Sequence, residues 1–218
     1  MLAASSLSRV LPGLGAAFEA EHPGTRVVLS FGASSRLGQQ VLAGAPADVF
    51  VSASATVMRQ VVEAGDVAAP RVIAQNAAQV AVYPPSAGRV SSLSDLAEPG
   101  LKVALCQTQV PCGSLAQQVL TKARVQVTPV TRGLDAASTL ATVVSGEVDA
   151  AIVYVTDVRA AGSAVVGVDI PASSNATTAY EVATIRASTR TRLAGEFAAL
   201  LLSAAGQQAL MDAGFRAP

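Results

Sequence analysis

The sequence has no tryptophan, only one histidine and two cysteines, and few charged or aromatic residues. Charged residues make up 14% of its 218 residues, and 15 Lys and Arg balance 15 Asp and Glu. This balance argues against nucleic-acid binding, which needs surplus positive charge to neutralise phosphates. A hydrophobic content of 51% argues against disorder. The longest apolar stretches, such as 197–202, fall far short of the roughly 20 residues that a spanning helix needs. These features predict a compact α/β protein.

The scarcity of histidine argues against a serine hydrolase. The single histidine, His22, stands in E-A-E-H-P-G, where a helix is expected to end, and a surface position near a helix C-terminus explains it. No G-x-S-x-G motif occurs. A nucleophile at Ser6 or Ser34 would lack a base, because His22 lies at the far end of the helix that follows Ser6, about 20 Å away at 1.5 Å per residue. We therefore expect no enzyme.

The two cysteines, Cys106 and Cys112, stand in C-Q-T-Q-V-P-C. This is not a recognised metal-ligand spacing, and no histidine or second cysteine pair lies near. We expect no direct protein ligand to a metal. Two interpretations remain open from the residues: buried free thiols in a reducing compartment, or a local disulfide in an oxidising one.

Short apolar runs alternate with helical periods, which is typical of a mixed or parallel sheet wrapped by helices. Helices are expected at 7–21, 36–43, 58–64, 113–123, 136–145, 191–202 and 207–213. Strands are expected at 25–30, 48–52, 75–83, 101–106, 125–130, 150–154 and 178–186. The two long runs, 75–83 and 178–186, are predicted crossovers between two lobes. The first lobe would comprise 1–78 plus 185–218, and the second 79–184.

Small residues recur where an expected strand gives way to a helix. These turns lie at 3–7, 32–35, 110–113 and 134–136. A helix N-terminus presents unpaired backbone N–H groups and partial positive charge, so it can hold an anion without a cationic side chain. Small residues let the backbone approach a ligand closely. A single serine there is simply a good N-cap, but four such turns together favour anion binding.

Several motifs resemble one family in order along nearly the whole chain. They are A-A-S-S-L at 3–7, F-G-A-S-S-R-L at 31–37, G-A-P-A-D-V-F at 44–50, V-P-C-G at 110–113, A-I-V-Y at 151–154 and G-Q-Q-A-L-M-D-A-G-F at 206–215. They look like the periplasmic molybdate-binding proteins of molybdate ABC importers. The resemblance implies a type 2 periplasmic-binding-protein fold: α/β, with two lobes that are each a mixed sheet flanked by helices, and a ligand in the interlobe cleft.

The resemblance also implies what the protein does. It would capture molybdate or tungstate, use no cofactor, act as a monomer and deliver the anion to an ABC permease. It would work outside the cytoplasm, in the periplasm or as a cell-surface lipoprotein. We expect that a leader has been removed and that Met1 stands inside the first strand.

The family's ligands carry over onto this sequence as two serine hydroxyls, two backbone amides and one tyrosine hydroxyl. They are Ser6, Ser34 (with Ser35 as the near competitor), the amides of Cys112 and Ala136, and Tyr154. Without the resemblance, Tyr154 equally fits a core aromatic at a strand end. The inferred oxidising compartment favours a disulfide between Cys106 and Cys112. We expect Asp48 to cap local backbone amides, because a carboxylate in the pocket would repel the ligand.

Other functions remain open at this point. The same fold could bind sulfate or phosphate, although a phosphate pocket often adds a carboxylate, and Asp135 is the one carboxylate in the four turns. A cytosolic effector-sensing domain of a regulator is a third possibility, but no DNA-binding module is present to support it.

Overall fold

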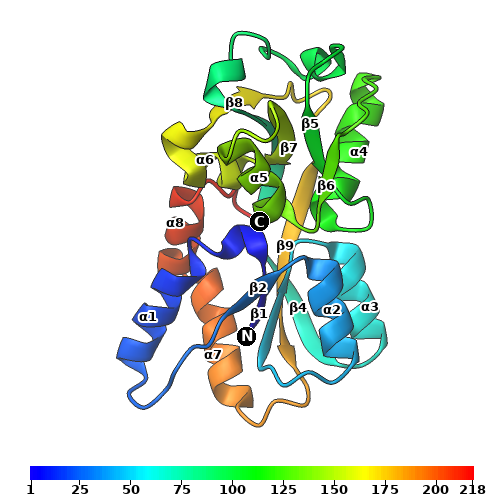
Figure 1. Ribbon diagram of the computed structural model, residues 1–218. Helices are drawn as coiled ribbons and strands as arrows, with labels where there is room; N and C mark the ends of the chain where they lie inside the picture. Colours follow the sequence, from blue (N-terminus) through cyan, green and yellow to red (C-terminus); the bar gives the residue numbers. More distant parts are fainter. The chain divides into compact units, whose positions relative to one another are not determined.

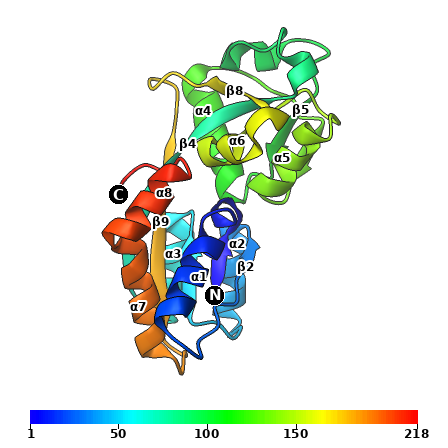
Figure 2. The ribbon, with the colours of Figure 1, turned by 90° about the vertical axis from the view of Figure 1, so that its left-hand side faces the viewer.

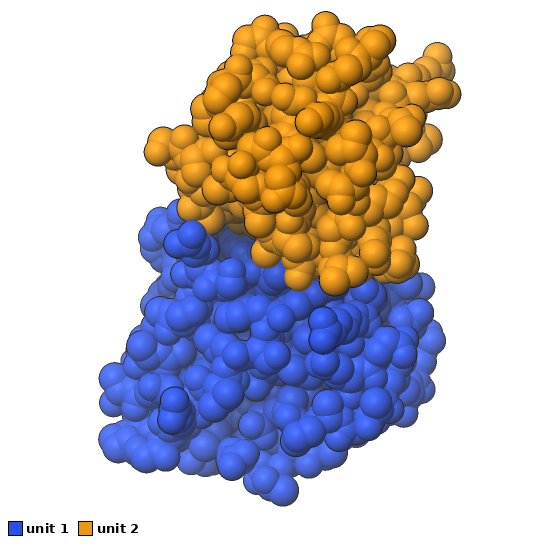
Figure 3. All heavy atoms as spheres, in the orientation of Figure 1, with its two compact units in different colours: residues 1–75, 178–218 blue, residues 76–177 orange.

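Two strands, β4 (Val67–Val82) and β9 (Thr177–Ile185), carry the chain across the boundaries between two folded units. The structure, a computed structural model, describes residues 1–218. Unit 1 comprises Met1–Gln75 with Thr178–Pro218, and unit 2 comprises Asn76–Thr177 (Figure 3). The expected crossover run 178–186 corresponds to β9, and the boundary expected between 184 and 185 lies between 177 and 178 in this division, because β9 residues 181–184 pair with a strand of unit 1.

Unit 1 contains a sheet with the strand order β2-β1-β3-β9, in which the first three are parallel and β9 is antiparallel to β3. The other strands are β1 (Leu2–Ala4), β2 (Ser30–Gly32) and β3 (Val49–Ser52). Its helices are α1 (Leu11–Glu21), α2 (Ser34–Leu42), α3 (Ala55–Glu63), α7 (Thr191–Leu202), α8 (Ala204–Asp212) and the 3₁₀ turn η1 (Ser5–Leu7).

Both faces of this sheet are covered, and each has its own core. Phe50 and Leu2 pack with residues of α2 and α3, whereas Val51 and Ala3 pack with residues of α1, α7 and α8. Neighbouring residues of one strand therefore face opposite layers, as the two-residue period of a strand requires. Figures 1 and 2 show α1 and α7 on one side of the sheet and α2 and α3 on the other.

Unit 2 is built on β4, which pairs antiparallel with β7 (Ala150–Tyr154) and with β8 (Val166–Asp169). Beyond β7 follow β5 (Val103–Cys106) and β6 (Thr131–Gly133), both parallel to it. Its helices are α4 (Pro111–Ala123), α5 (Ala136–Val144) and α6 (Val155–Ala161), with 3₁₀ turns η2 (Pro84–Ser86), η3 (Leu93–Ala97) and η4 (Gly162–Ala164). Each α-helix begins shortly after β5, β6 or β7 ends.

Several expected elements agree with the structure and others do not. The helix at 191–202 and the strand at 150–154 are confirmed to the residue. The first helix was expected from residue 7, but it begins at Leu11 after the turn η1. Strands expected at 25–30 and 125–130 are largely wrong: β2 begins at Ser30 and β6 at Thr131. Both are edge strands, and in both approach segments an apolar residue faces solvent: Val28 is 66% exposed and Val130 60%.

The sequence did not predict α6 or β8. None of the helices combines the length and apolar character that a membrane span requires.

Candidate anion-binding site

In unit 1, the two predicted serines follow neighbouring parallel strands. Ala4 of β1 is paired in register with Gly32 of β2, and Ser6 and Ser34 each come two residues later. Both are buried, with exposures of 8% for Ser6 and 1% for Ser34. The structure therefore brings these two serines to the same carboxyl edge of the sheet, the edge at which open α/β sheets bind ligands.

The hydroxyl of Ser34 is held by the segment that follows β3. The backbone N–H of Ala53 donates to Ser34 Oγ at 2.8 Å, and the carbonyl of Ala53 accepts from Thr178 Oγ1 at 2.7 Å. Because Ser34 Oγ accepts this bond, its own proton remains available to an acceptor such as an oxyanion. The competitor Ser35 is only half-buried.

Ser6 has a partner that the sequence did not reveal. Its Oγ lies 2.6 Å from the phenolic oxygen of Tyr180, a fully buried residue of β9. The ring of Tyr180 packs edge-on against Phe215, with ring centroids 5.0 Å apart. Tyr180 therefore fixes the Ser6 side chain from a part of the chain 174 residues away.

In unit 2, the three remaining predicted residues lie at the ends of parallel strands. Tyr154 is the last residue of β7, Cys112 is the second residue of α4 after β5, and Ala136 is the first of α5 after β6. Their exposures are 4% for Cys112 and 2% for Ala136 and Tyr154. Because β7, β5 and β6 are parallel, these residues share one carboxyl edge of the unit 2 sheet.

The starts of α4 and α5 present backbone donors that their own caps do not use. The side chain of Asp135 accepts the N–H of Ser138 at 2.7 Å, and its carbonyl accepts the N–H of Thr139 at 3.1 Å. The N–H of Ala136 comes before these groups and has no intrahelical acceptor. The N–H of Cys112, the second residue of α4, also lies in the first turn of its helix, and the N–H of Gly113 after it donates to the Val110 carbonyl at 3.0 Å.

The disulfide expected between Cys106 and Cys112 is present, with the two Cα atoms 5.8 Å apart. It joins the last residue of β5 to the first turn of α4. One of the two proposed amide donors is thus covalently fastened to the sheet.

A buried carboxyl group that the sequence did not single out lies beside Tyr154. The backbone N–H of Tyr154 donates to Asp157 Oδ2 at 3.0 Å. The pKa of Asp157 is raised from 3.8 to about 7, mainly by burial; the hydrogen bond from Tyr154 opposes this rise and the nearby charge of Asp135 adds to it. The short spacing Y-V-T-D, a cap at the start of α6, is the signal that could have identified it.

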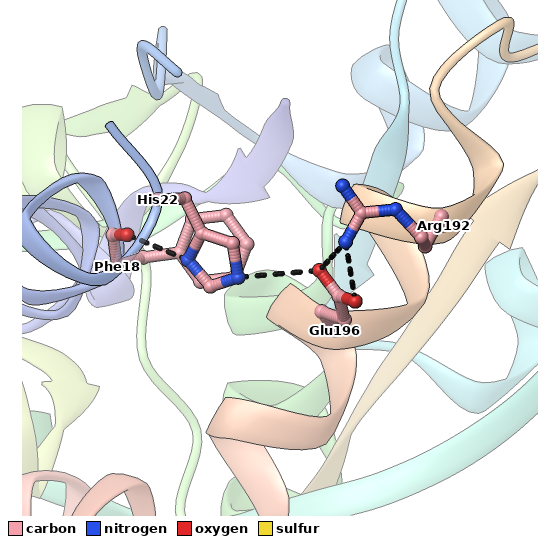
Figure 4. Close-up of polar contacts among 4 residues, drawn as sticks. All are labelled: Phe18, His22, Arg192 and Glu196. Carbon is pink, nitrogen blue, oxygen red and sulfur yellow. Dashed lines mark hydrogen bonds and ion pairs between the residues drawn. The ribbon is translucent and has the colours of Figure 1, made fainter. Parts of the chain in front are cut away.

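His22 has a structural role. It caps the C-terminus of α1, where Nδ1 lies 2.8 Å from the carbonyl of Phe18 and the two rings stack with centroids 4.0 Å apart. Its Nε2 lies 3.2 Å from Glu196 of α7, which also pairs with Arg192 at 2.7 Å (Figure 4). The histidine therefore joins two helices of one layer.

Asp48 was expected to cap local backbone amides, and this expectation is wrong. Its Oδ1 accepts from the hydroxyl of Ser188 at 2.6 Å, and Arg190 lies 3.7 Å from Oδ2. The carboxylate instead fastens the segment that precedes α7 to the start of β3, because Ser188 lies beside it in the folded unit.

The proposed donors are all neutral, and their chemistry suits an anion with several acceptor oxygens. Hydroxyl and amide N–H groups donate hydrogen bonds without adding charge, and charge-assisted bonds to an anion are stronger than neutral ones. No group of three or more His, Cys, Asp or Glu side chains comes together to hold a metal ion. Donors of this kind suit an oxyanion that is held through hydrogen bonds.

Known proteins resemble this chain over its whole length. Molybdate-binding protein ModA of Mycobacterium tuberculosis is 33% identical over 219 residues, which cover 100% of this chain and 84% of the relative. The periplasmic molybdate-binding protein of Azotobacter vinelandii aligns with a TM-score of 0.88 at 20% identity, covering 100% of this chain and 98% of that one. The sulfate-binding protein SubI of M. tuberculosis aligns with a TM-score of 0.86 at 20% identity, covering 99% and 85%.

The likeness to these two solved structures concerns the fold, and it confirms the expected α/β periplasmic-binding-protein fold with its mixed sheets and flanking helices. The family is fixed by sequence. Residues 1–216 match the description of bacterial extracellular solute-binding proteins, and the ModA relative spans the whole chain. The chain therefore belongs to the family of bacterial extracellular solute-binding proteins, with the molybdate-binding protein ModA among its relatives.

Proposed function

We propose that this protein captures molybdate or tungstate outside the cytoplasm and delivers it to the permease of an ABC importer. The observation that carries the proposal is the placement of five neutral donors at the carboxyl edges of two sheets, in a chain related over its full length to a molybdate-binding protein. The donors are the hydroxyls of Ser6, Ser34 and Tyr154 and the amides of Cys112 and Ala136.

The proposed ligand is one tetrahedral dianion. Each charge-assisted hydrogen bond contributes about 1.5–3 kcal/mol net. Five such bonds contribute roughly 7.5–15 kcal/mol in total, against an association cost of about 4 kcal/mol or more, so the upper part of the range supports micromolar affinity, which needs about 8 kcal/mol. The site needs no cofactor and performs no chemistry on the anion. The protein would act as a monomer in the periplasm or as a cell-surface lipoprotein.

A second candidate ligand is sulfate, because a sulfate-binding protein has a similar fold. The size of the anion distinguishes sulfate from molybdate as the ligand. Sulfate has shorter bonds than molybdate, so donors held at fixed positions for the larger anion would be left partly unpaired around sulfate. An unpaired buried donor loses affinity. Fixed donors are a feature of this chain, since Ser6, Ser34 and Cys112 are each held by another residue.

Calorimetry and thermal unfolding with molybdate, tungstate, sulfate and phosphate test the proposal. Molybdate and tungstate should raise the melting temperature by several degrees, since a ligand at 100 times its Kd adds about 2.7 kcal/mol of stability. Equimolar sulfate and phosphate should give little or no shift. Equal shifts with sulfate would make the protein a general oxyanion binder, and no shift with any of the four would remove the proposed function.

A further inference from the structure

Thr139 of α5 links the disulfide to the start of its own helix. Its side chain is fully buried, and Oγ1 lies 3.2 Å from Cys106 Sγ and 2.8 Å from the carbonyl oxygen of Asp135. Asp135 is the N-cap of α5, directly before Ala136. One hydroxyl group therefore contacts both the cystine that fastens Cys112 and the residue that presents the Ala136 amide.

The chemistry of the two contacts is different. A sulfur atom in a disulfide carries no hydrogen, so it cannot donate to the threonine. The single hydroxyl proton goes to the stronger acceptor, the carbonyl of Asp135, and the oxygen itself rests against Cys106 Sγ. Thr139 is thus oriented from one side by a hydrogen bond and from the other by the sulfur.

The surrounding backbone packs closely on this contact. A Cβ added to Gly133 would overlap Thr139 Oγ1, and one added to Gly113 would overlap the carbonyl of Gln107. The N–H of Gln107 donates to the Gly133 carbonyl at 2.9 Å. The ends of β5 and β6 and the first turns of α4 and α5 are therefore packed against one another around the disulfide and Thr139.

We propose that Thr139 is a positioning residue: together with the Cys106–Cys112 disulfide it sets the spacing between the amides of Cys112 and Ala136, and thereby the size of anion that this edge accepts. This inference rests on the proposed function. The disulfide holds the α4 amide to β5, and Thr139 holds the α5 start to the same sulfur. Reduction by an added thiol such as dithiothreitol, which is oxidised to its own disulfide as the cystine becomes two thiols, would release the Cys112 end of α4 and leave the Cys106 sulfur free to move from Thr139, so binding would depend on the redox state.

The test compares Thr139→Val, which keeps the shape of the side chain and loses the hydroxyl, with Thr139→Ser, which keeps the hydroxyl. Thr142→Val is the matched control, because the Thr142 hydroxyl donates to the Thr139 carbonyl at 2.8 Å on the same helix. We expect Thr139→Val to raise the molybdate Kd about 3–10-fold, the range of one hydrogen bond. Thr139→Ser and Thr142→Val should stay within about twofold.

Selectivity and redox state provide the readouts that a purely structural role would leave unchanged. Thr139→Val should reduce the preference for molybdate over sulfate. Replacing both cysteines by alanine, which keeps the Cys112 backbone amide, should weaken molybdate binding. Adding Thr139→Val to the cysteine double variant should raise the molybdate Kd by a smaller factor than Thr139→Val does in the wild type. The effects of coupled residues are not additive. Additive effects, or an unchanged ratio of molybdate to sulfate affinity, would overturn the inference.

Amide hydrogen exchange on the ligand-free protein separates this inference from the proposed function. Reduction, or Thr139→Val, should speed exchange of the amides at positions 138 and 139, which are hydrogen-bonded to Asp135, and the control Thr142→Val should not. The wild type could bind none of the four anions while exchange still responded in this way. That result would support the link between the disulfide, Thr139 and the start of α5, and it would contradict molybdate or tungstate as the ligand. If molybdate bound and exchange at α5 ignored the disulfide, Thr139 would have no positioning role.

Discussion

The Ser6 hydroxyl and the Tyr180 phenol lie 2.6 Å apart, although 174 residues separate them in sequence. A phenol is a better proton donor than an aliphatic alcohol, since its pKa is about 10. With Tyr180 as the donor, Ser6 Oγ accepts and keeps its own proton for a ligand. Ser34 is held in the same way, by the N–H of Ala53 at 2.8 Å. In that arrangement both serines of unit 1 receive one hydrogen bond and can give one.

Tyr180→Phe tests this relationship. The variant keeps the ring that packs against Phe215 and removes only the hydroxyl. We expect the molybdate Kd to rise about 3–10-fold, because Ser6 would lose the partner that orients it. Isothermal calorimetry measures the change, and Tyr83→Phe in unit 2 is the control. An unchanged Kd would show that Ser6 orients itself without the phenol.

The two serines should each contribute a charge-assisted hydrogen bond. Ser6→Ala and Ser34→Ala are expected to weaken molybdate binding by roughly 1.5–3 kcal/mol with the fold intact. Ser35→Ala is the matched control, because Ser35 neighbours Ser34 but is only half-buried. Circular dichroism confirms folding before calorimetry. Wild-type affinity in both buried-serine variants, or a loss in Ser35→Ala, would show that the wrong hydroxyls were assigned.

Asp157 should make stability depend on pH. Burial raises its pKa from 3.8 to about 7, so between these values the folded state holds a proton that the unfolded state has lost. The contribution of Asp157 is therefore fully present below about pH 4 and is lost as pH rises to 7. The variant Asp157→Asn cannot ionise, so its free energy of unfolding should rise relative to that of the wild type between about pH 4 and 7. Above pH 7 the difference between the two proteins should stay constant.

Urea unfolding of the ligand-free protein at several pH values measures the effect. Asp95→Asn is the control, because the pKa of Asp95 is shifted in the opposite direction: hydrogen bonds from Ser91 and Ser92 lower it. The stability that Asp95 contributes is therefore present above about pH 3.8 and is lost as the pH falls below this value. A difference between Asp157→Asn and wild type that did not change from pH 4 to 7 would mean that Asp157 is ionised in the folded protein.

Binding should bring the two units into a closed arrangement. Only β4 and β9 carry the chain between the units, and few crossings are typical of a hinge. We predict that small-angle scattering gives a smaller radius of gyration with saturating molybdate than without it. Sulfate at the same concentration and Ser34→Ala with molybdate are the controls. A radius that molybdate left unchanged would indicate a rigid protein.

The sequence predicted elements whose signals lie in a few consecutive residues. Pro111 and the small residues around Gly113 indicated the start of α4. The apolar run 150–154 indicated a strand. The edge strands were misplaced because the runs 25–30 and 125–130 are rich in valine, which favours strands. In the folded protein these segments are only partly buried, and Val28 and Val130 face solvent out of phase with their apolar neighbours.

The proposed ligand groups were accessible to sequence reasoning, and their supports were not. Ser6, Ser34 and Cys112 stand in turns whose small residues mark a helix start. Tyr180 and Thr139 lie inside a strand and a helix, where a hydroxyl has no local pattern. Their partners are 174 and 33 residues away, so only the folded chain identifies them.

The discontinuous make-up of unit 1 has a consequence for the order of folding. Unit 2 is a single continuous stretch, Asn76–Thr177, whereas unit 1 needs its sheet completed by β9 and its second core completed by α7 and α8 from the end of the chain. Domains fold as units when all of their residues are available. In a chain that emerges from the N-terminus onward, unit 2 can therefore be completed before unit 1, because Ser6 meets Tyr180 only after residues 76–177 have emerged.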